Sequence, residues 1–86
     1  MFDIKFNDKC RKRLLKLPKE ISSRIIKKIK ELPHNPIPHD AKRIVNVRGK
    51  IFRVRVGDYR ILYVVSYEEN LIIIVNIDNR ERVYDF

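Results

Sequence analysis

The sequence predicts an α+β fold, in which an N-terminal strand and two short helices pack on a largely antiparallel sheet of four to five strands. Apolar residues recur at helical spacing before residue 33, and they alternate with polar residues after residue 40. Between these regions, residues 33–40 contain three prolines and are expected to form an extended connector. The chain has 86 residues, the size of one domain, so we expect residues 1–86 to form a single unit.

The first part of the chain predicts a strand followed by a helical hairpin. Residues 1–6 alternate between apolar and polar side chains, and Asn7 or Asp8 can cap the helix that follows. Pro18 ends this helix and fits the first turn of the next one. The apolar positions of the first helix are Phe6, Cys10, Leu14 and Leu17; those of the second are Ile21, Ile25, Ile26, Ile29 and Leu32. We expect these apolar stripes to cover one face of the sheet.

The second part of the chain predicts four strands, at residues 42–47, 51–56, 59–66 and 71–77. A two-residue joint with glycine first, Gly57-Asp58, favours a type II′ hairpin turn. In that register Val56 faces Tyr59, and Arg55 lies directly opposite Arg60. Arg53, Arg55, Arg60, Leu62 and Val64 then share one face of the sheet, and the core face carries Phe52, Val54, Val56, Tyr59, Ile61, Tyr63 and Val65.

This register brings like charges together, which destabilises a sheet unless the arginines are paired or bind an anion. One explanation is a set of ion pairs with acidic residues: Asp58, Asp78, Glu81 or Asp85. The other is a phosphate-binding site, because the planar guanidinium group donates two parallel hydrogen bonds to phosphate. We favour the phosphate site.

The charge distribution supports a nucleic-acid partner. The formal net charge is +9, and all five basic residues after position 50 are arginines: Arg53, Arg55, Arg60, Arg80 and Arg82. Arg80, Arg82 and Tyr84 occupy alternate positions, so in an extended tail their side chains would point the same way. Two guanidinium groups could then bind RNA phosphate, and the aromatic ring could stack on an unstacked base. A solvated tail with Tyr84 in the core is the alternative. The basic outer face of the helices is either solvated or docks on ribosomal RNA.

Other site classes receive little support. Cys10 is the single cysteine, so the chain has no intrachain disulfide and no cysteine-based zinc site. A core thiol, a reducing compartment and a cytoplasmic location are expected, and no membrane span is evident. His34 and His39 flank the proline-rich connector and are weak candidates for acid–base catalysis or metal binding, since no third ligand is evident.

Two motifs resemble the RelE toxins of the RelE/ParE superfamily, and the resemblance covers nearly the whole chain. Residues 52–63 (FRVRVGDYRILY) look like the family's strand with alternating basic residues, glycine-containing turn and following strand. Residues 79–84 (NRERVY) look like its terminal Arg and Tyr region. The resemblance implies a toxin that cuts messenger RNA in the ribosomal A site and needs no metal or cofactor. It also implies a RelB-like antitoxin, the ribosome and mRNA as partners.

The resemblance also implies residue roles. Arg53 and Arg55 would hold the substrate and assist removal of the 2′-hydroxyl proton, Arg60 would stabilise charge on the phosphate, and Arg80 would lie beside the leaving oxygen. Tyr84 would stack on or orient the base, while Arg82 and Lys50 would contact RNA.

One departure from the family pattern concerns proton transfer. The positions of Arg53 and Arg55 are commonly lysine in the family, and arginine does not deprotonate at neutral pH. Lys50, Tyr84 or water are the remaining candidate bases, and a site without a base is a further alternative. Two other functions are kept open: a ParE-like inhibitor of DNA gyrase, and a non-catalytic RNA-binding module.

Overall fold

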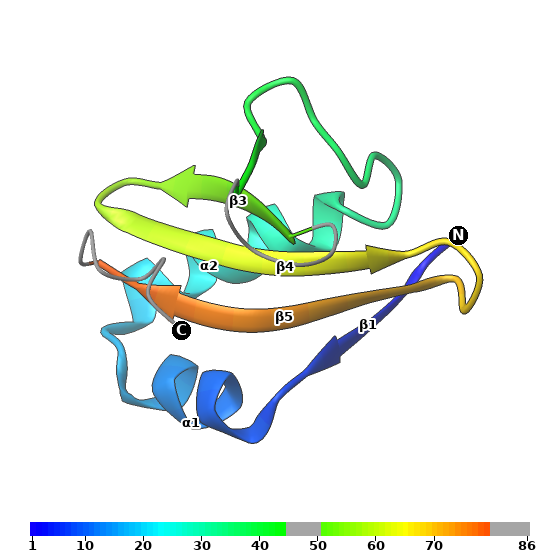
Figure 1. Cartoon of the computed structure of the whole chain (residues 1–86). Coiled ribbons are helices and arrows are strands. Elements are labelled where there is room, and N and C mark those ends of the chain that lie inside the picture. The colour runs from blue at the N-terminus through cyan, green and yellow to red at the C-terminus, as the bar shows by residue number, and fades with distance from the viewer. Residues whose placement is uncertain (45–50, 80–86) are drawn as a thin grey trace.

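A mixed five-stranded sheet with two helices on one face forms the molecule in the computed structural model, which describes residues 1–44 and 51–79 (Figure 1). The elements in chain order are β1 (Asp3–Phe6), α1 (Asp8–Lys16), α2 (Lys19–Glu31), β2 (Lys42–Arg43), β3 (Ile51–Val56), β4 (Tyr59–Ser66) and β5 (Leu71–Asp78). The strand order is β1-β5-β4-β3-β2, with β1 parallel to β5 and the other neighbours antiparallel. The predicted α+β fold with a largely antiparallel sheet is confirmed.

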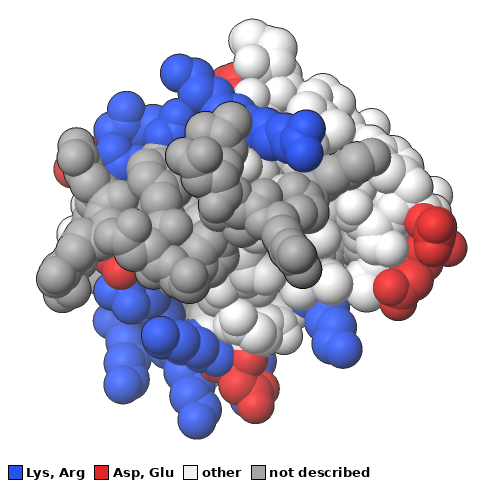
Figure 2. Space-filling model, in the orientation of Figure 1, with Lys and Arg blue, Asp and Glu red and all other residues white. Residues whose placement is uncertain are grey.

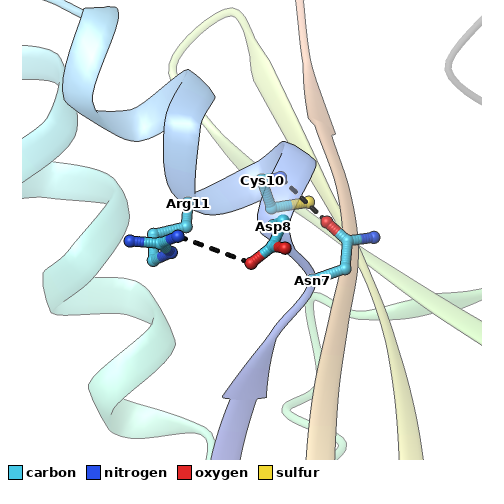
Figure 3. A network of polar contacts seen from close by, with 4 residues as sticks. All are labelled: Asn7, Asp8, Cys10 and Arg11. Carbon is cyan, nitrogen blue, oxygen red and sulfur yellow. Dashed lines mark hydrogen bonds and ion pairs between the residues drawn. The ribbon is translucent and has the colours of Figure 1, made fainter.

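Asn7 joins the start of α1 to the sheet. Its side-chain oxygen accepts a hydrogen bond of 2.8 Å from the backbone N–H of Cys10, which caps the helix (Figure 3). Its amide nitrogen donates a hydrogen bond of 2.9 Å to the carbonyl oxygen of Val75 in β5. Of the two residues that the sequence offered as caps, the structure therefore uses Asn7, and one side chain holds both the helix and a central strand.

The main core lies between the helices and one face of the sheet. It contains Cys10, Ile25, Ile29 and Leu32 from the helical region, and Phe52, Val54, Ile61, Tyr63, Val65, Ile72, Ile74 and Ile77 from the sheet. The predicted core face of β3 and β4 is thus confirmed. Ile26 is an exception to the predicted helical stripe, because 37% of it is exposed. It stands at the border of the stripe, next to Ile25, which is fully buried.

The proline-rich connector is attached to the body of the molecule by two side-chain contacts. The hydroxyl of Tyr63 donates a hydrogen bond of 2.7 Å to the carbonyl oxygen of Pro36, and burial raises the pKa of this phenol. Lys28 on α2 forms a 2.9 Å ion pair with Asp40, and this hydrogen bond lowers the pKa of the Asp40 carboxyl. These contacts fix both halves of the connector.

Several element boundaries differ slightly from the sequence prediction. β1 begins at Asp3, β5 extends to Asp78, and Pro18 is the N-cap of α2, one position before its first turn. β2 is Lys42–Arg43, and residues 45–47 of the predicted strand lie outside the described residues. No helix within residues 1–44 and 51–79 is long and apolar enough to span a membrane.

We expect Asn7→Ala to lower the free energy of unfolding by about 0.5–2 kcal/mol, the usual effect of losing an N-cap side chain. Urea denaturation monitored by circular dichroism measures this change. Asn7→Asp is the matched control, because a carboxylate still caps the helix but cannot donate to Val75. Equal stability of the wild type and Asn7→Ala would contradict the role given to this cap.

Candidate functional site

The hairpin between β3 and β4 has the register that the sequence predicts. Val56 pairs with Tyr59, and Arg55 pairs with Arg60. Gly57 has a φ of +59°, the left-handed conformation that the first position of a type II′ turn requires and that glycine adopts without strain. The two-residue turn therefore determines which side chains of both strands share a face.

Three arginines converge on the face of the sheet opposite the helices. Arg53 lies two residues before Arg55 on β3, and Arg60 lies across from Arg55 on β4. Burial and then the positive charges of Arg60 and Arg55 lower the pKa of Arg53. The Nε atom of Arg60 is buried. The guanidinium groups are thus close enough to interact electrostatically, and guanidinium groups are the side chains best suited to bind an anion such as phosphate.

Asp78 connects this patch to α1. It is the cross-strand neighbour of Arg60 on β5, so Arg55, Arg60 and Asp78 form one row across three strands. A carboxylate oxygen of Asp78 lies 3.4 Å from a guanidinium nitrogen of Arg13 on α1. Asp78 was one of the acidic residues predicted as partners of the sheet arginines, and this ion pair joins it to Arg13 of α1. The carboxylate of Asp78 lies beside Arg60 in the sheet and contacts Arg13, and the four arginines outnumber it, so this part of the described surface is positively charged.

An apolar cluster continues the same face beyond the arginines. Ile51 and Leu62 are buried there, and Ile44, Val64 and Val75 pack against them. The pairing of β4 with β5 shifts between Leu62 and Tyr63, a bulge that leaves Val75 out of the ladder. The arginines of this face therefore lie next to a small apolar cluster, and an apolar surrounding strengthens the interaction of a charged group with a bound anion.

The basic surface also extends from Arg55 around the turn to α2. A shallow groove is lined there by Arg24, Lys27, Lys28 and Glu31 together with the turn. The guanidinium of Arg24 lies 3.6 Å from the place that a Cβ atom on Gly57 would occupy. In the view of Figure 2, lysine and arginine side chains gather in two groups at the left of the molecule. The sequence did not separate Arg13 or Arg24 from the other basic residues of the helices.

The remaining predicted site residues are not brought together in the described part of the chain. Lys50, Arg80, Arg82 and Tyr84 lie outside the described residues, as do Glu81 and Asp85. His34 and His39 are exposed on the connector. Within residues 1–44 and 51–79, no cluster of His, Cys, Asp and Glu could hold a metal ion. Burial raises the pKa of the Cys10 thiol to about 11, against the opposing charges of Lys9 and Arg13.

A family model matches most of this chain. The model described as the ParE toxin of the type II toxin–antitoxin system parDE matches residues 4–84. The chain belongs to the RelE/ParE toxin family. A curated protein of Methanocaldococcus jannaschii that carries the toxin name RelE1 is 39% identical over 87 residues, a match that covers 94% of this chain and 97% of the relative.

Solved structures of RelE–RelB complexes share the fold of this RelE/ParE family member. The RelE–RelB complex of Pyrococcus horikoshii contains a chain with a TM-score of 0.82 and 27% identity, covering 94% of this chain and 97% of that one. The RelBE2 complex of Mycobacterium tuberculosis gives a TM-score of 0.78 and 26% identity, covering 92% and 98%. The resemblance to RelE toxins inferred from residues 52–63 is thereby confirmed.

We expect Arg55→Gln to raise the free energy of unfolding by about 0.2–1 kcal/mol, because it removes a like charge directly across from Arg60. Chemical denaturation at low and at high salt measures the effect, which should shrink as salt screens the repulsion. Arg43→Gln is the matched control, since the residue across from Arg43 is the uncharged Phe52 on the core face. Lower stability of Arg55→Gln would contradict electrostatic crowding at this position.

We expect Cys10 to resist alkylation in the native protein. A thiol pKa of about 11 leaves very little thiolate at pH 8, and the side chain is 2% exposed. Iodoacetamide at pH 8 should modify native protein about 100-fold more slowly than protein unfolded in urea, as followed by mass spectrometry. Equally fast modification of both forms would show that this thiol is accessible.

Proposed function

We propose that this toxin is a ribosome-dependent endoribonuclease that cuts messenger RNA in the ribosomal A site and thereby stops translation. The observation that carries the proposal is the convergence of Arg53, Arg55 and Arg60 on one face of the sheet. These are the positions at which the RelE resemblance implies contact with the scissile phosphate. The M. jannaschii relative carries a toxin name, and the related solved chains are RelE proteins.

The proposed reaction is an internal transfer of the phosphate. The 2′-hydroxyl of the ribose loses its proton and attacks the adjacent phosphorus, and the bond from phosphorus to the 5′-oxygen breaks. One product ends in a 2′,3′-cyclic phosphate, and the other begins with a 5′-hydroxyl after its oxygen takes up a proton. Negative charge increases on the phosphate oxygens during the attack, so preorganised guanidinium groups stabilise the transition state more than the ground state.

In this proposal Arg60 stabilises the charge on the phosphate, and Arg53 and Arg55 hold the substrate beside it. Arginine remains protonated in proteins, so these side chains act by charge and hydrogen bonding. Lys50, Tyr84 or water accepts the proton of the 2′-hydroxyl. Arg80 serves the leaving oxygen, Tyr84 orients the base, and Arg82 and Lys50 contact the RNA.

The proposed partners are a RelB-like antitoxin, the ribosome and mRNA, and the proposed location is the cytoplasm. Support for the antitoxin comes from the related structures, which were solved as complexes of RelE with RelB. Support for a nucleic-acid partner comes from the net charge of +9 and from the arginine patch. The acidic or amphipathic segments of an antitoxin would neutralise this charge and exclude the toxin from the ribosome.

A ParE-like inhibitor of DNA gyrase is the second candidate, because the matching family model is that of a ParE toxin. This function needs the fold but not the arrangement of Arg53, Arg55 and Arg60. A supercoiling assay with purified gyrase separates the two functions. Inhibition of supercoiling without cleavage of mRNA in translating ribosomes would favour the gyrase inhibitor over our proposal.

We expect wild-type protein to produce cuts within A-site codons in a translating extract, detected by primer extension. Arg60→Ala should reduce cleavage about 100- to 1,000-fold, the usual effect of removing a group that stabilises developing charge. Circular dichroism should show that the variant keeps its fold.

Arg43→Ala is the matched control. Arg43 is an exposed arginine of the same sheet, but it lies opposite Phe52, on the core face and away from the arginine patch. It should leave cleavage nearly unchanged. Intact mRNA in an extract with active ribosomes and folded wild-type protein would overturn the proposed function, and full activity of Arg60→Ala would overturn the role of Arg60. RNA binding without cleavage would indicate a non-catalytic module instead.

A further inference from the structure

A carboxylate lies beside the arginine to which the proposed function gives the phosphate. Asp78 on β5 is the direct cross-strand neighbour of Arg60, so both side chains point to the same face of the sheet. The Cβ atoms of such neighbours are about 4.5–5.5 Å apart, which puts a carboxylate within reach of a long arginine side chain. Because carboxylate and phosphate bind guanidinium in the same way, Asp78 is a potential competitor of a phosphate for Arg60.

Two donors hold the carboxylate of Asp78 by one of its oxygens. Its Oδ1 atom accepts a hydrogen bond of 2.7 Å from the backbone N–H of Asn79, and it lies 3.4 Å from a guanidinium nitrogen of Arg13 on α1. The side chain of Asp78 is 16% exposed and that of Arg13 is 37% exposed. Solvent screens such a pair less than a fully exposed one, so Arg13 draws the carboxylate toward α1.

The position of Arg13 follows from the short length of β1. This strand pairs with residues 71–74 of β5, and β5 continues to Asp78 beyond that pairing. α1 starts directly after β1 and lies beside the continuation of β5, where Asn7 donates its hydrogen bond to Val75 (Figure 1). Arg13 is in the last turn of α1, so it reaches the end of β5 from the side of the strand that β1 does not cover.

We infer that Arg13 is a positioning residue for Arg60, because it holds the carboxylate of Asp78 toward α1 and so limits its competition with a bound phosphate. Arg13 acts through Asp78 and does not itself contact the phosphate. The consequence for RNA cleavage rests on the proposed function, whereas the consequence for phosphate binding does not.

A second ion pair on α1 provides a matched control. Arg11 lies 3.4 Å from Asp8, the same distance as between Arg13 and Asp78 (Figure 3). Both side chains of this pair are largely exposed, and Asp8 belongs to the helix, not to the sheet. Arg11→Gln and Arg13→Gln remove the same charge from the same helix. The difference between the two variants therefore measures what Arg13 does through Asp78.

The first experiment titrates the full-length protein, with isotope-labelled arginine, with inorganic phosphate and follows the NMR signals of the arginine side chains. We expect phosphate to shift the Nε–H signal of Arg60. Arg13→Gln should weaken this binding about 3- to 10-fold, because the carboxylate of Asp78 then turns to Arg60. Arg11→Gln should weaken it less than about 2-fold. Arg13→Lys keeps a charge that can pair with Asp78 and should stay within about 2-fold of the wild type.

A double-variant cycle separates positioning from direct contact with the phosphate. Asp78→Asn removes the competing charge, so phosphate should bind at least as tightly as it binds the wild type. In that background Arg13→Gln should have no more effect than Arg11→Gln, because no carboxylate is left to hold. Circular dichroism should show that every variant is folded, since both members of the pair are partly exposed.

Three results would overturn the inference. The first is weaker phosphate binding of Arg13→Gln by the same factor with and without Asp78→Asn, which would mean that Arg13 contacts the phosphate directly. The second is an equal effect of Arg13→Gln and Arg11→Gln when Asp78 is present. The third is an Arg60 signal that does not respond to phosphate in the wild type.

A translating extract separates this inference from the proposed function. Arg13→Gln should reduce cleavage of mRNA about 3- to 10-fold, and addition of Asp78→Asn should restore it. If the phosphate titrations give the expected results but the wild type leaves mRNA intact, the inference holds for phosphate binding and the proposed function fails. If the wild type cuts mRNA and Arg13→Gln has no effect in either assay, the proposed function stands and the inference fails.

Discussion

The register of the β3–β4 hairpin is the constraint on which the rest of the structure depends. Side chains alternate between the two faces of a strand, so a slip of one residue would exchange the faces. It would place Arg53 and Arg55 under the helices and expose Phe52 and Val54. Gly57 adopts the left-handed conformation that this turn requires, and Val54 is fully buried on the core face. Both features are compatible with the same register. Local turn chemistry and core packing therefore agree.

This sheet has two different faces because only one of them is covered by helices. The covered face is apolar and forms the main core with Ile25, Ile29 and Leu32. The opposite face combines a small apolar cluster with closely spaced arginines. The helices in turn leave an apolar groove at the β1 edge, on the side away from the arginines. A small chain thus presents a charged surface on one face of the sheet and an apolar groove at the edge of the other.

The arginine patch reflects a balance between stability and binding. Arg55 opposite Arg60 is unfavourable in the isolated sheet, and the nearby positive charge of Arg53 adds to the repulsion. Asp78 offsets part of the repulsion, while its ion pair with Arg13 ties α1 to the same row of residues. A bound phosphate would relieve the remaining repulsion. Such local strain is typical of binding sites, where neighbouring charges are held in place for a ligand.

The sequence by itself determined the order of the elements, the hairpin turn and the shared face of Arg53, Arg55 and Arg60, because these follow from local periodicity and from the conformational freedom of glycine. Tertiary structure decided the rest. The parallel pairing of β1 with β5, the position of Asp78 beside Arg60 and the contact of Arg13 with Asp78 join residues that are far apart in the chain. The exposure of Ile26 and the apolar groove also depend on how two helices meet the sheet edge. Helical periodicity identifies an apolar stripe, but the packing of neighbouring elements decides which part of that stripe is buried.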